Sequence, residues 1–147
     1  MPIRFFYEEI EFKLSNPVKI KKWLSLSAKK EKRAIMDINY IFCSDTFLLE
    51  LNQKYLRHQT LTDIITFDES REKAVAGEIY ISIDRVAENA HLYGVDFQSE
   101  VRRIMIHGVL HLCGYADKSK SEKTLMRKKE DAYLSLWHNL FHVKRSS

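Results

Sequence analysis

Two histidines and an aspartate between residues 107 and 117 have the chemistry and spacing of metal ligands. His107 and His111 are four residues apart, so on a helix both imidazoles project from one face. Gly114 suits the left-handed C-terminal cap of such a helix, and beyond that turn Asp117 can return a carboxylate toward the rings. Three protein ligands leave one position of a tetrahedral ion open, which distinguishes a catalytic zinc site from a structural one. These residues predict a metal-dependent hydrolase.

The alternative is that each ring is a buried histidine bonded to a backbone carbonyl. The chain carries a control, because His138 and His142 have the same spacing but are followed by neither a capping glycine nor a carboxylate; we expect no native metal there. A metallopeptidase of the H-E-x-x-H type has glutamate where this chain has Gly108, so peptidase activity is disfavoured. Cys113 lies off the helical face of His111, and we interpret it as a small buried hydrophobe rather than a ligand.

Composition is typical of a single soluble domain spanning residues 1–147, with 45% apolar residues. No stretch approaches the roughly 20 apolar residues of a membrane span, and no apolar run follows the N-terminus as in a signal peptide. With two cysteines, Cys43 and Cys113, one disulfide stays open as an alternative, but a disulfide scaffold is not indicated. We therefore expect a cytoplasmic protein without membrane contact.

Positive charge is concentrated in two segments of a chain whose net charge is +4. Residues 19–33 hold seven basic residues against one acidic residue, and residues 117–130 hold six against three. Such clusters are either solvated helix faces or binding sites for a polyanion. The second cluster begins beside Asp117, which favours nucleic-acid binding there, with Lys118 and Lys120 as its first contacts.

Hydrophobic periodicity predicts a mixture of strands and helices. We expect an α+β domain of the three-layer α/β type, with a small mixed four-stranded sheet and about five helices. The segment from Ile104 to Cys113 is apolar nearly all round, so the metal site should lie at the end of a buried helix. Aromatic residues at helical spacing, including Trp23, Trp137 and the tyrosines, are interpreted as core rather than as base-stacking platforms. The predicted strands are 3–8, 34–43, 62–67 and 77–83, and the predicted helices are 17–32, 45–55, 84–93, 96–113 and 121–141.

The segment His107–Asp117 resembles the signature H-G-x-L-H-L-x-G-Y-D-H of the YbeY family, zinc-dependent single-strand endoribonucleases that act in ribosomal RNA maturation. Residues 51–55 and 62–67 (LNQKY and TDIITF) are similar to the family's L-N-x-x-Y-R and T-D-V-L-S-F segments, and residues 76–82 (AGEIYIS) are similar to L-G-D-I-x-I-S. The resemblance covers nearly the whole chain, and its eleven-residue signature is highly specific. It implies one zinc ion per chain, ribosomal RNA as substrate, and the small ribosomal subunit as a partner.

The chain departs from this family pattern at two places. The third ligand of the family is usually histidine, whereas here it is Asp117, with Ala116 in place of the family's aspartate. Aspartate is an acceptable zinc ligand, although an oxygen donor widens the choice of metal. The family also has an arginine, thought to engage phosphate, where this chain has Leu56. Arg57 takes over that role if the loop shifts by one residue, with His58 as a second candidate; the alternative is an exposed arginine without a role.

Our leading hypothesis is a zinc-dependent endoribonuclease for single-stranded RNA, acting in ribosomal RNA maturation and ribosome quality control. His107, His111 and Asp117 would hold the metal, and Arg57 would stabilise charge on the phosphate. The predicted RNA contacts are Arg57, His58, Lys118 and Lys120. The rival hypotheses are a metal-stabilised RNA-binding or ribosome-assembly factor without catalysis, and a metal-dependent hydrolase of another substrate.

Overall fold

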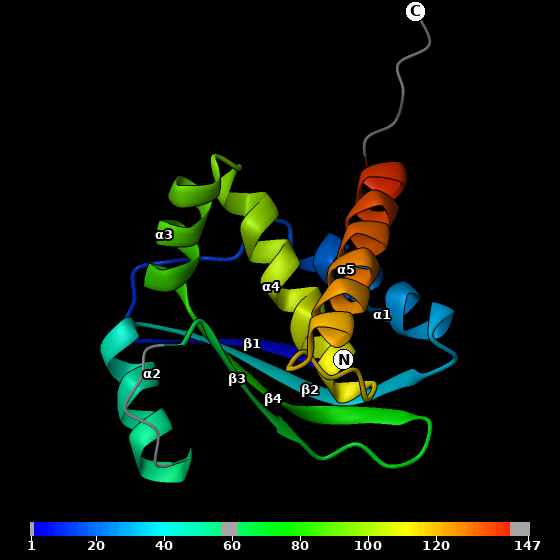
Figure 1. Cartoon of the computed structure of the whole chain (residues 1–147), viewed down its shortest axis with the longest axis horizontal. Helices are drawn as coiled ribbons and strands as arrows, with labels where there is room; N and C mark the ends of the chain where they lie inside the picture. The colour runs from blue at the N-terminus through cyan, green and yellow to red at the C-terminus, as the bar shows by residue number, and fades with distance from the viewer. Residues whose placement is uncertain (1, 57–61, 142–147) are drawn as a thin grey trace, which may run out of the picture.

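The structure, a computed structural model, describes residues 2–56 and 62–141, which form one sheet with helices packed around it (Figure 1). The strands are β1 (Ile3–Glu8), β2 (Ala34–Cys43), β3 (Ile64–Asp68) and β4 (Ala74–Ser82). The helices are α1 (Pro17–Lys30), α2 (Asp45–Leu51), α3 (Ile83–Tyr93), α4 (Phe97–Leu112) and α5 (Lys120–Phe141), and a π-helical turn, η1 (Asn52–Leu56), continues α2. The predicted α+β class with five helices is confirmed.

The sheet is mixed, with the strand order β1-β2-β4-β3. β1 and β4 both run parallel to β2, whereas β3 pairs antiparallel with β4, so that Thr66 lies opposite Ile79. This arrangement confirms the predicted mixed four-stranded sheet, and β3 and β4 form a hairpin. The hairpin places the residues that lead into β3 beside α4.

The fourth strand begins earlier than the sequence predicts. The sequence predicts a strand over 77–83, but β4 begins at Ala74 because Ala74 and Val75 pair with the start of β2. Val75 is fully buried by this pairing. The strand ends at Ser82, whose side chain accepts a hydrogen bond of 3.1 Å from the backbone N–H of Arg85 and so caps α3.

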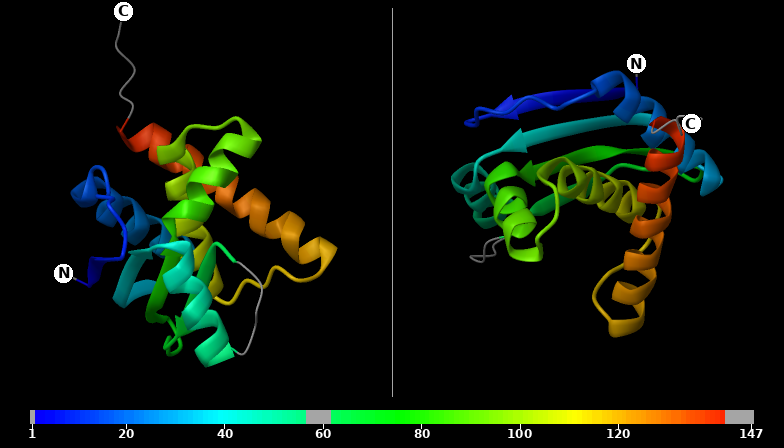
Figure 2. Two further views of the ribbon diagram at one scale, coloured as in Figure 1. Left: turned by 90° about the vertical axis from the view of Figure 1, so that its left-hand side faces the viewer. Right: turned by 90° about the horizontal axis from the view of Figure 1, so that it is seen from above.

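Helices cover both faces of the sheet, which confirms the three-layer prediction. The main core lies between the sheet and the helices α1, α4 and α5, and includes Tyr40 and Phe42 of β2 and Ile79 of β4. Because side chains alternate along a strand, Cys43 and Ile65 face the other way, where they pack against Leu48 of α2. Figure 2 shows α3 and α4 on the same side of the sheet. In the described part of the chain, no helix combines the length and apolar character needed to cross a membrane.

Gly108 allows α4 to lie directly on the sheet. A Cβ atom at this position would come within 2.9 Å of two side-chain carbons of Ile79 and within 3.3 Å of Ile64. The glycine therefore sets the close approach between α4 and the strands β3 and β4. This contact fixes the rotation of α4, so that the neighbouring His107 is turned away from the sheet interior.

Candidate metal centre and its cleft

The C-terminal end of α4 brings the two histidines to the surface and reverses the chain behind them. Gly114 adopts φ of +102°; its N–H bonds the carbonyl of His111 at 2.9 Å, and the N–H of Tyr115 bonds the carbonyl of Leu110 at 3.0 Å. This pair of bonds is a Schellman motif. The predicted glycine cap is therefore confirmed, and the turn directs Asp117 back toward the helix end.

Side-chain atoms of His107, His111 and Asp117 converge on one point. The two Nε2 atoms are 2.9 Å apart, and Oδ2 of Asp117 lies 3.2 Å from each of them. A tetrahedral ion with bonds of about 2.0–2.1 Å would hold its ligand atoms roughly 3.3 Å apart, close to these separations. Among the described residues this is the one group of three side chains spaced to hold a metal ion.

The hydrogen bonds on the far side of each ring show that the converging atoms are electron-pair donors. Nδ1 of His107 lies 2.6 Å from a carboxylate oxygen of Glu130, and Nδ1 of His111 lies 2.9 Å from the carbonyl oxygen of Tyr115. Both partners are acceptors, so each Nδ1 carries the proton and each Nε2 offers a lone pair. Two lone pairs and a carboxylate facing one another repel unless a cation or proton lies among them, and a divalent metal fits this set.

Glu130 is a buried carboxylate that orients His107 from α5. Its second oxygen accepts a bond of 2.7 Å from Arg103, which also pairs with Asp131 at 2.6 Å. Burial alone would raise the pKa of Glu130, but the hydrogen bonds from His107 and Arg103 outweigh it and lower that pKa. The pKa of His107 is raised, because its bond to Glu130 outweighs the opposing effect of burial. A metal that binds Nε2 of His107 therefore competes with a proton for that atom.

A second polar cluster holds the loop that carries the third ligand. Glu31, at the end of α1, accepts hydrogen bonds from the hydroxyl of Tyr115 at 2.6 Å, from the ammonium of Lys129 at 3.0 Å and from the hydroxyl of Tyr133. Burial would raise the pKa of Glu31, but these bonds lower it. Because Tyr115 also supplies the carbonyl that fixes His111, this cluster ties the metal-site loop to α1 and α5.

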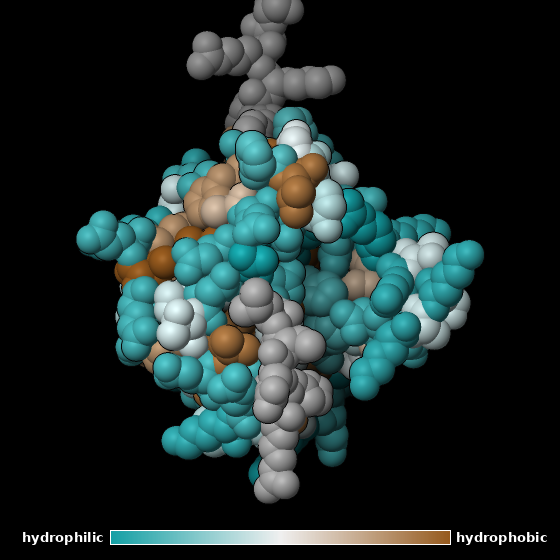
Figure 3. All heavy atoms as spheres, turned by 60° about the vertical axis from the view of Figure 1, so that its left-hand side comes forward, coloured by the Kyte–Doolittle hydropathy of each residue, from teal (hydrophilic) through white to brown (hydrophobic). Residues whose placement is uncertain are grey.

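The metal centre opens into a cleft of about 710 Å³. Its floor is one stripe of α4, and its walls come from α5 on one side and from α3 and the entry to β3 on the other. Figure 3 shows a hollow on this side of the molecule, beside a hydrophilic projection. Burial raises the pKa of Asp63 and of Glu100, two carboxyl groups of the cleft. The lining residues are Thr62, Asp63, Ile64, Thr66, Asn89, Tyr93, Glu100, Arg103, Ile104, His107, His111, Asp117, Lys123, Met126, Arg127 and Glu130.

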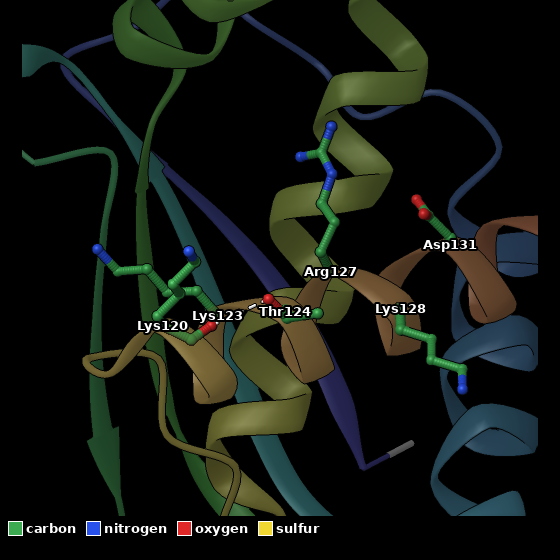
Figure 4. A pocket seen from close by; sticks show the side chains of 6 residues that line it. All are labelled: Lys120, Lys123, Thr124, Arg127, Lys128 and Asp131. Atoms are coloured by element: carbon green, nitrogen blue, oxygen red, sulfur yellow. Dashed lines mark hydrogen bonds between the residues drawn. The ribbon is translucent and has the colours of Figure 1, made fainter.

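The outer face of α5 continues the basic wall of the cleft. Lys123 and Arg127 line the cleft and also a shallow depression of about 660 Å³ on α5, shared with Lys120 and Lys128. Figure 4 shows Lys120 and Lys123 extending in one direction from the helix and Lys128 in another. Lys118 is exposed in the preceding turn and lines neither depression.

Comparison with known proteins identifies the family. The model of the family described as endoribonuclease YbeY matches residues 6–138. The chain belongs to the YbeY family. Curated relatives named endoribonuclease YbeY include those of Flavobacterium psychrophilum, 50% identical over 96% of this chain and 98% of the relative, and Cytophaga hutchinsonii, 50% identical over 91% and 94%. A solution structure from Thermotoga maritima superimposes with a TM-score of 0.69 at 28% identity, covering 94% of this chain and 91% of that one.

Of the predicted site residues, the structure brings His107, His111 and Asp117 together. Arg57 and His58 lie outside the described residues. Leu56 is exposed at the end of η1.

The residues interpreted as non-ligands behave differently from the triad. His138 belongs to no described group of metal-ligating side chains, and His142 lies outside the described residues. Cys43 and Cys113 are buried free thiols. Burial raises the pKa of Cys113 to about 11, so its thiol stays protonated at neutral pH, as suits a small buried hydrophobe.

Three supporting residues of the site were not predicted from the sequence: Glu130, Arg103 and Glu31. A signal for Glu130 was present, because it falls within the buried stripe of α5 that includes Met126, Tyr133 and Trp137. A carboxylate inside an apolar stripe requires a partner. Identifying that partner as His107 required the packing of α5 on α4.

Proposed function

We propose that this protein is a zinc-dependent endoribonuclease that hydrolyses single-stranded RNA in ribosomal RNA maturation and ribosome quality control. His107, His111 and Asp117 would hold one zinc ion. The observation that carries the proposal is the convergence of three electron-pair donors in a cleft with a basic wall, in a chain whose curated relatives are named endoribonucleases. We further propose that it works in the cytoplasm and with the small ribosomal subunit.

The chain's own residues would prepare the site for phosphodiester hydrolysis. Zinc bound there would supply Lewis acidity toward a phosphate oxygen and lower the pKa of water. Glu130 and the carbonyl of Tyr115 keep each Nδ1 protonated, so that both Nε2 atoms stay available as ligands. Such partners also fix the ring orientations before substrate binds, which reduces the reorganisation needed during the reaction.

Basic residues would attract and orient the RNA backbone. Lys123 and Arg127 are exposed on the α5 wall and form no ion pair with a described residue, so both remain free for phosphates. Arg103, by contrast, is paired with Glu130 and Asp131 and serves the metal centre. The substrate would thus enter along α5, with its scissile phosphate near Asp117.

Cleavage of a synthetic single-stranded RNA by the purified, zinc-loaded protein tests the proposal. His111→Ala should abolish cleavage and stoichiometric zinc, whereas the matched variant His138→Ala should retain both. Binding of RNA without cleavage by the wild type would favour the rival, a metal-stabilised RNA-binding or ribosome-assembly factor. Two observations favour this rival: Asp117 replaces the family's usual histidine ligand, and Leu56 replaces its arginine. Cleavage of another substrate class alone would favour a different hydrolase.

Lys118, in the turn before α5, and Lys120, the first residue of α5, are proposed to contact RNA. Each phosphate contact on a single strand contributes about −0.7 to the slope of log affinity against log salt. The double variant Lys118→Ala and Lys120→Ala should therefore have a flatter slope than the wild type, with unchanged zinc content. An equal slope in both proteins would remove these lysines from the RNA track.

Arg57 is proposed as the group that stabilises charge on the phosphate, with His58 as a second contact. A guanidinium offers two parallel hydrogen bonds to phosphate, and loss of one transition-state donor costs about 100-fold or more in rate. Arg57→Ala should slow cleavage by about that factor and keep its zinc, and Arg57→Lys should restore only part. Cleavage within about threefold of wild type in Arg57→Ala would refute the assignment.

A further inference from the structure

One aromatic ring in the cleft is exposed, against the interpretation that such residues belong to the core. Tyr93, in the last turn of α3, is 65% exposed and lines the cleft together with the metal ligands. Other exposed aromatic side chains of the described chain, Phe6, Tyr7 and Tyr55, do not line it. Leu92, its neighbour, is equally exposed but also lies outside the cleft. The position of Tyr93 is therefore not explained by packing.

The two walls of the cleft have complementary chemistry for a nucleotide. The α5 wall presents the cations of Lys123 and Arg127, whereas the α3 wall presents the ring of Tyr93 and, one helical turn earlier, the amide of Asn89. Cations attract phosphates, an aromatic face stacks on a base, and an amide can bond a base edge. The metal ligands lie on the floor between these walls.

We propose that Tyr93 is a base-stacking subsite for a nucleotide next to the scissile phosphate, with Asn89 bonding the edge of the stacked base. The proposal rests on the proposed function, because it names how the same cleft holds its RNA. It also gives a physical reason for preferring single strands. Bases inside a duplex are stacked on their neighbours, so they have no free face to offer to Tyr93.

Binding of two probes to the zinc-loaded protein isolates the stacking contribution. One probe is a 2′-O-methyl adenosine octamer, whose integrity is checked by gel after each titration, and the other is its abasic counterpart, which keeps the sugar–phosphate backbone. Stacking contributes about 1–3 kcal/mol per base, so Tyr93→Ala should weaken binding of the octamer by about 5- to 150-fold. Binding of the abasic probe should change by less than about twofold, and zinc content should not change.

Three further measurements separate stacking from structural damage. Tyr93→Phe keeps the ring and should bind the octamer within about twofold of wild type, as should the control Leu92→Ala. The salt slope of Tyr93→Ala should equal that of the wild type, because stacking releases no counterions. Equal losses for both probes, or no loss for either, would overturn the inference while RNA cleavage by the wild type still upheld the proposed function. A wild type that neither binds the probes nor cleaves RNA would overturn both.

Discussion

Glu130 and Asp131 are neighbouring carboxylates that both pair with Arg103, but only Glu130 also bonds the metal ligand His107. Replacing each carboxylate by its amide therefore distinguishes a group that supports the metal centre from one that forms only a surface ion pair. Glu130 is 7% exposed and accepts bonds of 2.6 Å from His107 and 2.7 Å from Arg103. Asp131 accepts a bond of 2.6 Å from the same Arg103 but is 59% exposed. The amides keep the shape of both side chains, so the comparison isolates charge and burial.

We expect Glu130→Gln to weaken zinc binding by about 10- to 100-fold, the usual cost of losing the partner of a ligating histidine. This corresponds to about 1.4–2.7 kcal/mol. Without zinc, the lost charged hydrogen bonds should lower the free energy of unfolding by about 1.5–3 kcal/mol. Asp131→Asn should cost less than about 1 kcal/mol, because an exposed ion pair contributes little, and should bind zinc within about twofold of wild type.

Titration against a chelator of known zinc affinity, combined with denaturant unfolding of the zinc-free proteins, measures both quantities. If Glu130→Gln bound zinc as tightly as wild type, the assignment of Glu130 as the group that orients His107 would be refuted. Equal losses in Glu130→Gln and Asp131→Asn would show instead that the placement of Arg103, and not the carboxylate on the histidine, controls the site.

Three other predictions concern the elements around the centre. Gly108→Ala should lower the free energy of unfolding by up to about 2 kcal/mol, since overpacking costs about 1–3 kcal/mol and the gain in helix propensity returns about 1; denaturant melts measure this, and a more stable variant would contradict the close contact. Asp117→Ala should lose at least about tenfold in zinc affinity while Asp117→His retains zinc, as metal analysis after gel filtration would show; equal binding by wild type and Asp117→Ala would place the third ligand elsewhere. The lowered pKa of Glu31 means that its ionised form stabilises the fold above its ordinary pKa, so Glu31→Gln should be less stable at pH 7, and the difference should shrink as pH falls below about 4; a difference independent of pH would contradict this.

The parts of the site that the sequence predicted depend on contacts close in the chain. The two histidines, the cap at Gly114 and Asp117 span eleven residues. Helix geometry sets the two histidines and the cap, whereas the turn that carries Asp117 is also held by the bond between Tyr115 and Glu31. The predicted start of β4 was wrong because it depends on a contact between segments that are distant in the chain. Ala74 is a weak strand former and joins the sheet through pairing with β2, which is distant in sequence.

The partners of the residues that support the metal ligands depend on how the helices pack across one another. The hydrophobic periodicity of the sequence does not specify that packing. Glu130 meets His107 across 23 positions, and Glu31 meets Tyr115 across 84. A buried stripe in α5 indicates that Glu130 has a partner, but several basic groups of α4 and α1 would satisfy that requirement equally well. The α4–α5 packing selects His107 and Arg103, and so makes the carboxylate part of the metal centre.

Gly108 affects both the packing of α4 on the sheet and the chemistry available at the metal centre. In the sequence, a glycine at the position where H-E-x-x-H peptidases have glutamate disfavours peptidase chemistry. The structure adds that a side chain at this position would begin against Ile79 and Ile64, pointing into the sheet rather than toward the cleft. A glutamate placed there could not act as a base at the metal centre without moving α4. Groups that handle protons in this site must therefore come from other positions, and two carboxyls whose pKa burial raises, Asp63 before β3 and Glu100 on α4, already line the cleft.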